Sequence, residues 1–290
     1  MILVFGFDFA KFLGSGNDSS LSPRLGFQYD LNSKTRFRAA YTAQTEEKSW
    51  ANVIDLEGEQ IAFTEPVSIE DIYVVRGKPQ MNKSRRLEFG VERVLGSSSS
   101  VEANAFFDTT FGRGVGLTSF APNAGSLDGF QEITANQNGA ARGLRVVYSR
   151  RLNEIFSTSV GYAFGNGQRL NSSDITEPSR VFESGFFQSF FAQLAADLTS
   201  GTSVKTVFRL SPQATVFAID PFKGRLAIYD PGLSVFVTQN LPTFGFRVRA
   251  QAIVDARNVF DFQNGVTGDE GSLTLNSHRR LLRGAIQFRF

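Results

Sequence analysis

The sequence predicts an all-β protein whose antiparallel strands form a transmembrane β-barrel, with about 12 strands in this chain. Two observations predict this class. Stretches in which apolar and polar residues alternate recur along the whole chain, as in strands that have one lipid-facing and one polar-facing side. The connections between these stretches are alternately short and long. In addition, no stretch approaches the roughly 18–20 apolar residues of a membrane-spanning helix.

The alternating pattern sets the positions of the strands. It is clearest near residue 250, where Phe244, Phe246 and Val248 share one face and Arg247 and Arg249 share the other. The same period of two predicts strands over residues 2–13, 23–31, 35–44, 84–95, 100–111, 141–152, 155–166, 185–198, 203–211, 226–239, 243–257 and 277–290. An even number of strands places both ends of the chain on the side of the short turns.

The lengths of the connections predict the orientation in the membrane. The short ones are residues 32–34, 96–99, 153–154, 199–202 and 240–242. The long ones are residues 14–21, 45–83, 112–140, 167–184, 212–224 and 258–276. Outer-membrane barrels have short periplasmic turns and longer external loops. We therefore expect a protein of the outer membrane of a Gram-negative-type envelope, with one barrel domain over residues 1–290.

Composition excludes several function classes. The net charge is +2 over 290 residues, and basic residues do not alternate with aromatic ones on one exposed face, so no nucleic-acid partner is expected. With no cysteine and one histidine, the chain lacks the usual ligands for zinc, and we expect no metal and no cofactor. His278 lies beside Arg279 and Arg280 at the start of the last strand. It has no evident nucleophile or orienting group, so no enzymatic activity is expected.

Charged residues on the polar face of the predicted strands would line the lumen of the barrel. They are of both signs: Arg36, Arg38, Glu88, Glu92, Glu102, Asp108, Asp197, Lys205, Arg209, Arg247, Arg249, Asp255, Arg257, Arg283 and Arg289. Two interpretations stay open. The charges neutralise one another along the wall of a water-filled pore, or they hold a plug domain or guide an anionic ligand.

Aromatic residues near the short turns would form a girdle at the periplasmic interface. They are Tyr29, Phe37, Tyr148, Phe156, Phe244 and Phe288. Arg93 and Arg150 lie at a similar level on the apolar faces of their strands. A lipid-facing arginine costs about 2–4 kcal/mol at the bilayer midplane but only about 0–1 kcal/mol near an interface. Their positions therefore agree with the predicted orientation.

Four segments resemble parts of the barrel of TonB-dependent outer-membrane receptors. They are Ser22–Leu31 (SPRLGFQYDL), Arg85–Arg93 (RRLEFGVER), Asp255–Asp261 (DARNVFD) and Gly284–Phe290. In the last of these, Ile286, Phe288 and Phe290 resemble the signal that the barrel-assembly machinery reads. The resemblance implies a receptor that takes up a bulky nutrient such as a siderophore, a glycan or a peptide.

The resemblance also implies partners and a larger barrel. Such receptors have about 22 strands, a plug domain inside the barrel and a segment that contacts the TonB energy-coupling complex. This sequence shows no plug, so the resemblance predicts the carboxy-terminal part of such a barrel, with outer-membrane lipid and the assembly machinery as further partners. The alternative is a self-contained passive channel of 12 strands, similar to a porin.

Overall fold

The computed structural model describes residues 1–11, 19–46, 51–56, 59–64, 73–75, 78–80, 82–120, 130–171, 180–219, 221–222, 232–242, 249–263, 265–268, 271–275 and 280–289. Over these residues the regular structure is entirely β. The same residues contain no helix with the length and apolar character needed to cross a membrane. The chain is therefore an all-β protein, as the sequence predicts.

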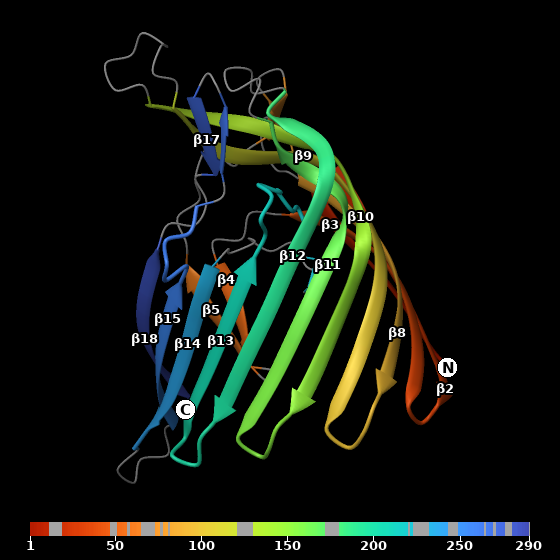
Figure 1. Ribbon diagram of the computed structural model, residues 1–290, viewed down its shortest axis with the longest axis vertical. Coiled ribbons are helices and arrows are strands. Elements are labelled where there is room, and N and C mark those ends of the chain that lie inside the picture. Colours follow the sequence, from red (N-terminus) through yellow and green to blue (C-terminus); the bar gives the residue numbers. More distant parts are fainter. Residues whose placement is uncertain are drawn as a thin grey trace.

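One curved antiparallel sheet contains twelve described strands that pair in chain order (Figure 1). They are β1 (Ile2–Lys11), β2 (Ser19–Asn32), β3 (Thr35–Glu46), β8 (Asn82–Val94), β9 (Ser99–Phe120), β10 (Phe130–Arg151), β11 (Phe156–Leu170), β12 (Phe182–Asp197), β13 (Thr202–Leu210), β14 (Gly232–Leu241), β15 (Arg249–Arg257) and β18 (Leu281–Arg289). Each of the twelve strands predicted from the sequence corresponds to one of these.

Three hairpins accompany this sheet. β4 (Ala51–Leu56) pairs with β5 (Glu59–Thr64), and β6 (Tyr73–Val75) pairs with β7 (Lys78–Gln80). The third hairpin, β16 (Gly265–Gly268) and β17 (Gly271–Leu275), belongs to the connection between β15 and β18. Its second strand pairs with the far end of β9. This connection therefore reaches from the last pair of strands to the middle of the sheet.

The predicted connection over residues 112–140 is wrong in large part. β9 continues to Phe120 and β10 begins at Phe130, so the two strands extend as a hairpin beyond the rest of the sheet. The pairing shifts between Gln137 and Gly139, and Gly112 takes a φ of 77°, which favours glycine. The extension is stable because it carries buried apolar side chains, which the Gly-rich sequence had obscured.

The short turns have a local chemical basis. The side-chain oxygen of Asn32 accepts hydrogen bonds from the backbone N–H of Lys34 and Thr35, at 2.9 and 2.8 Å. Asn153 does the same for Ile155 and Phe156, at 2.9 and 2.7 Å. Such asparagine-centred turns replace backbone pairing where a strand reverses. The described short turns lie together at the lower end of the sheet in Figure 1.

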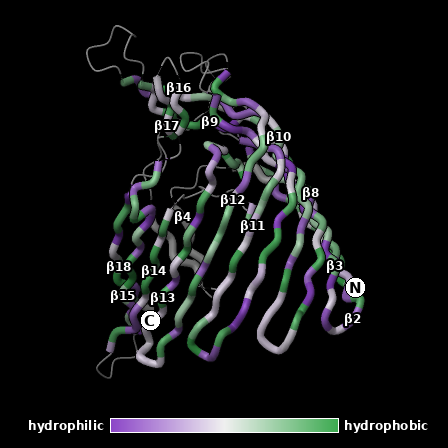
Figure 2. Tube along the Cα trace, in the orientation of Figure 1, coloured by the Kyte–Doolittle hydropathy of each residue, from purple (hydrophilic) through white to green (hydrophobic). Residues whose placement is uncertain are grey.

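The two faces of the sheet differ in character, and hydropathy alternates along the strands (Figure 2). Residues that face each other across neighbouring strands lie on the same side of a sheet. One such row contains Leu87, Phe107 and Arg142, and the row beside it contains Glu88, Phe106 and Gly143. The outer face exposes many large apolar side chains. Examples are Leu25, Phe27, Phe89, Leu144, Phe190 and Ile286.

The sheet is open within the described strands. β1 pairs with β2 alone, and β18 pairs with β15 alone. Each of these two edge strands therefore presents one row of backbone groups without a strand partner in the described part of the chain. Side chains on both faces of β1 are exposed, including Val4 and Phe5.

Candidate functional site

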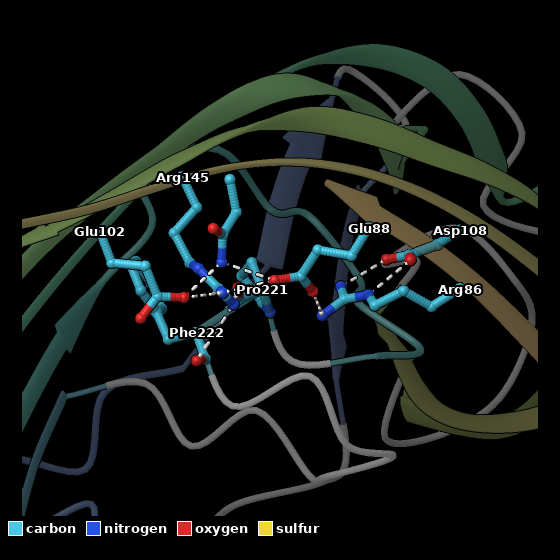
Figure 3. Close-up of polar contacts among 8 residues, drawn as sticks. Arg86, Glu88, Glu102, Asp108, Arg145, Pro221 and Phe222 are labelled. Carbon is cyan, nitrogen blue, oxygen red and sulfur yellow. Dashed lines mark hydrogen bonds and ion pairs between the residues drawn. The ribbon is translucent and has the colours of Figure 1, made fainter. Parts of the chain in front are cut away.

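The inner face of β8, β9 and β10 carries a network of charged side chains (Figure 3). Arg86 on β8 donates from Nε and Nη2 to the two carboxylate oxygens of Asp108 on β9, at 2.7 and 2.6 Å. Both side chains are almost fully buried, at 3% and 5% exposure. A two-point contact of this kind fixes the geometry of both partners. The guanidinium of Arg86 also lies 4.9 Å from the centre of the Phe106 ring.

Arg145 on β10 extends the network across two strands. Its Nη2 donates to Glu88 at 2.7 Å and to Glu102 at 3.1 Å. Asn104 donates to the same two carboxylates, at 2.5 Å each. Asn104 lies between Gly90 and Arg145 in one row of the sheet, and its amide occupies the space that a side chain at Gly90 would need. The glycine therefore makes room for the bridging amide.

The segment after β13, residues 211–222, folds back against this inner face. We call it the inner segment; Asp220 lies outside the described residues. Three long side chains donate hydrogen bonds to its backbone carbonyls. Arg113 reaches Phe217 at 2.6 Å and Gln137 reaches Val216 at 2.8 Å. Arg145 reaches Pro221 at 2.6 Å.

Backbone and aromatic contacts fix the inner segment further. Leu170 N–H donates to Ala214 at 2.9 Å, and Val216 N–H donates to Gln168 at 2.8 Å. Phe217 meets Phe187 edge to face, with ring centres 5.0 Å apart. Phe222 stacks on Phe191, with ring centres 5.1 Å apart. These contacts hold the inner segment in a fixed position against the inner face of the sheet.

The connection predicted over residues 212–224 lies between β13 and β14, as expected, but its described part packs against the inner face and is not external. Val216, Phe217 and Ile219 are buried, at 7%, 4% and 3% exposure. The signal was present in the sequence, because an external loop has no reason to carry the apolar run Val216–Ile219. Burial against the aromatic inner face of β12 explains the difference.

A second charged cluster lies near the short turns. Arg36 on β3 pairs with Asp30 on β2 at 2.6 Å and with Glu92 on β8 at 3.6 Å. Arg38 pairs with Glu92 at 2.6 Å. These side chains are partly exposed, so solvent screens each pair and its contribution to stability is small. The cluster keeps this end of the inner face polar and close to neutral.

The other predicted lumen residues lie on the same face wherever the structure describes them. Asp197 accepts from Ser203 at 2.6 Å, and Asp255 pairs with Arg257 at 3.0 Å. Arg209 is buried, with its guanidinium 5.8 Å from the centre of the Phe191 ring. The register also places four more positions on this face: Lys205, Arg249, Arg283 and the backbone of Arg289. Arg247 lies outside the described residues.

The predicted girdle and assembly residues lie on the outer face. Tyr29, Phe37, Phe156 and Phe288 are exposed there, and Tyr148 shares that face by register with Val160. Ile286 is exposed on the same side of β18 as Phe288. Phe244, His278 and Phe290 lie outside the described residues. The roles of these positions in lipid contact and assembly stay predictions.

Sequence reasoning missed three members of the central network, namely Arg86, Asn104 and Arg145. Two of them follow by period two from residues that were assigned, whereas Arg145 lies on a strand for which no lumen residue was predicted. Arg86 lies two positions from Glu88, and Asn104 lies two positions from Glu102. In the described part of the chain, no group of three histidine, cysteine, aspartate or glutamate side chains is placed to hold a metal ion. The network is built for charge pairing.

Above the network, apolar side chains close over the upper end of the sheet. Val115, Leu117 and Ala135 of the β9–β10 extension pack with Val216 of the inner segment and Leu273 of β17. Leu117, Ala135 and Leu273 have 0% exposure. The β16–β17 hairpin, the β9–β10 extension and the inner segment therefore form one packed unit.

No family model matches the sequence, and no curated protein matches it. Among solved structures, the chain is similar to the siderophore receptor PirA from Pseudomonas aeruginosa, with a TM-score of 0.40 and 8% identity over 94% of this chain. It is also similar to the FrpB iron transporter from Neisseria meningitidis, with a TM-score of 0.34 and 13% identity over 93% of this chain. A third similarity is to the monoaromatic hydrocarbon channel CymD, with a TM-score of 0.36 and 10% identity over 99% of this chain.

The similar structures differ in length. The chain spans 43% of the siderophore receptor and 40% of the iron transporter, but 78% of the hydrocarbon channel. At these identities and scores, the similarities assign no function to this chain.

Proposed function

We propose that this chain forms the wall of an outer-membrane transport barrel through which a polar or bulky solute passes. One observation carries the proposal: the two faces of a single long-stranded sheet are chemically opposite. The inner face holds the ion pairs of Arg86, Arg145 and Arg36, whereas the outer face exposes large apolar side chains. A wall with water on one side and lipid on the other needs this division.

The wall lies in the outer membrane of a Gram-negative-type envelope. A spanning β-structure has to satisfy its backbone groups through closed strand pairing, and barrels of this kind occur in that membrane. Outer-membrane lipid surrounds the exposed apolar face, and the barrel-assembly machinery inserts the chain through its terminal strand. The activity is transport rather than catalysis.

The barrel belongs to the TonB-dependent type. Within the described strands, β1 and β18 each have one edge without a strand partner, and this supports the assignment. In lipid, each unsatisfied backbone group on such an edge would cost several kcal/mol. Further strands between the two edges would enlarge the barrel. A wide barrel needs a plug to prevent leakage, as in 22-stranded transporters. The inner charges then hold a plug, and the cargo is a nutrient such as a siderophore, a glycan or a peptide.

The size of the native polypeptide tests the TonB-dependent type. An antibody raised against residues 231–290 would be used to probe outer-membrane fractions of the source cells. A band far above 31.9 kDa supports a larger, plugged receptor. A band near 31.9 kDa that changes mobility on heating contradicts it and favours a small barrel.

A self-contained passive channel of 12 strands is the second candidate. The observation that favours it is the position of the inner segment, which packs against the inner face of β10 to β12. There it would narrow the lumen of the barrel without a plug domain. This candidate predicts stepwise ion conductance when the purified chain alone is added to planar bilayers. Folded protein that inserts and yet conducts no ions would argue against it.

A further inference from the structure

Four arginines lie on the outer face of the sheet, among apolar side chains. Arg85 and Arg93 belong to β8, and Arg142 and Arg150 belong to β10. Opposite neighbours fix this placement: Arg142 faces Phe107, which in turn faces Leu87. All four arginines are exposed, and none makes a hydrogen bond or ion pair with any residue that the structure describes. Arg86 and Arg145, their neighbours on the inner face, are buried and paired.

The four arginines mark two levels that bracket an apolar band. On both strands the two arginines are eight residues apart. Eight residues extend about 27 Å along a strand, or about 20 Å of height at a tilt of roughly 40°. The outward residues between them are Leu87, Phe89 and Val91 on β8 and Leu144, Val146 and Tyr148 on β10. This height, with the reach of the arginine side chains, fits the apolar band of about 25 Å in outer-membrane barrels.

The upper pair, Arg85 and Arg142, lies toward the end with the long connections. The two are separated by β9 and staggered by two residues, because Arg142 is level with Leu87 in the pairing. Two strand spacings and two residues place their Cα atoms roughly 12 Å apart. The outward neighbours of Arg142 are Phe107 and Asn166, and those of Arg85 are Ala43 and Thr109; none of the four carries a charge. Nothing acidic on these adjoining positions competes for the two guanidinium groups.

We propose that Arg85 and Arg142 together bind the phosphate groups of an outer-leaflet membrane lipid. The inference rests on the proposed outer-membrane location. Guanidinium groups bind phosphate oxygens at two points, and both side chains stand where hydrocarbon gives way to charged headgroups. Leu87 and Leu144 are exposed on the same face, two residues further along their strands than Arg85 and Arg142. In this proposal they contact the acyl chains of the same lipid.

The test measures how much phosphorylated lipid the protein retains. The full native polypeptide would be purified from its own membrane in a zwitterionic detergent, and bound lipid would be counted by mass spectrometry and phosphorus assay. We expect the R85Q/R142Q variant to retain about tenfold less phosphorylated outer-leaflet lipid than the unmodified protein. The reason is that the variant loses the charge-assisted hydrogen bonds to the lipid phosphates. The matched control R93Q/R150Q removes equal charge at the opposite level and should retain it. Equal retention by both variants would overturn the proposal.

A second measurement needs no variant. The unmodified protein in vesicles of phosphatidylcholine would be titrated with lipid A, a disaccharide lipid with two phosphates, and with the same lipid after removal of both phosphates. The intact lipid should bind about tenfold more tightly and lose this advantage as salt is added. Equal binding of both forms by inserted protein overturns the lipid site alone. A protein that does not insert into any vesicle overturns the proposed function and the lipid site together.

Discussion

Arg145 links the wall of the sheet to the inner segment, because its Nη1 donates a 2.6 Å hydrogen bond to the backbone carbonyl of Pro221. Nη2 of the same guanidinium donates to Glu88 at 2.7 Å. One side chain on β10 thus joins a carboxylate of β8 to a segment that follows β13. A buried charge satisfied on both sides in this way fixes the position of the inner segment relative to the wall.

The first prediction concerns this link. Replacing Arg145 with glutamine removes the charge that Glu88 and Glu102 share, and it weakens the contact with Pro221. We expect the inner segment to open more often. Hydrogen exchange at Val216 N–H, which donates to Gln168 at 2.8 Å, should accelerate by about tenfold or more, the effect of roughly 1.4 kcal/mol. The outward V146A variant on the same strand is the control, and unchanged exchange in R145Q would contradict the prediction.

A second prediction uses the contact between Gly161 and Phe222. A Cβ atom at Gly161 would lie 2.8 Å from Cε1 of Phe222 and 3.2 Å from Cγ2 of Val147. G161A should therefore displace the Phe222 ring from its stack on Phe191, destabilising the fold by about 1–3 kcal/mol. F222A creates the missing space, so adding G161A to F222A should cost much less than adding it to the unmodified protein. Denaturant unfolding of the four proteins measures the difference, and additive effects would show that the two sites do not interact.

The third prediction separates the buried ion pair from an exposed one. Arg86 and Asp108 are nearly inaccessible, so R86Q leaves the Asp108 carboxylate without its charged partner, and D108N leaves Arg86 with the longer 3.9 Å contact to Glu88. R86Q and D108N should each destabilise the protein by about 3–5 kcal/mol, while the R86M/D108L double variant recovers most of that loss. The exposed pair Arg36–Asp30 is the comparison, and R36Q should destabilise the protein far less, because solvent screens this pair. Equal losses in the two pairs, measured by chemical denaturation, would refute this account.

The order and faces of the twelve strands could be predicted from the sequence because period two is a local property of the chain. Phe89 and Leu144 follow it on the outer face, as Glu88 does on the inner one. Because residues that face each other on neighbouring strands lie on the same side of the sheet, the assignment of inner and outer faces extends from one strand to the next. The positions of the short turns were equally local, since Asn32 and Asn153 organise them through their own neighbours.

The inner segment and the upper packed unit could not be predicted in the same way. Their stability comes from contacts between distant parts of the chain, such as Arg113 with Phe217 or Leu273 with the end of β9. Residues 112–140 were predicted as a connection, although Val115 and Leu117 are buried within β9. Local composition carries no information on which distant face will cover an apolar run, so tertiary packing overrode the local signal.

The last prediction concerns the hairpin that joins the end of the chain to its middle. Thr274 on β17 lies directly opposite Thr118 on β9, and its hydroxyl donates to the Thr118 carbonyl at 3.3 Å. Opposite residues in antiparallel strands have Cα atoms about 4.5–5.5 Å apart, which suits a disulfide. The natural chain has no cysteine, so T118C/T274C introduces a single clean pair.

We expect this pair to oxidise nearly completely in intact cells, seen as a mobility shift that reductant reverses. T118C/S272C is the matched control, because Ser272 lies opposite Phe120 and its Cα is roughly 7–8 Å from that of Thr118. If the hairpin must leave β9 for solute to enter, the oxidised T118C/T274C protein should transport more slowly, and reductant should restore the rate. Similar crosslinking of both pairs would mean that the hairpin does not hold this register in the membrane. Efficient crosslinking without an effect on transport would mean that solute enters by a route that leaves the hairpin in place.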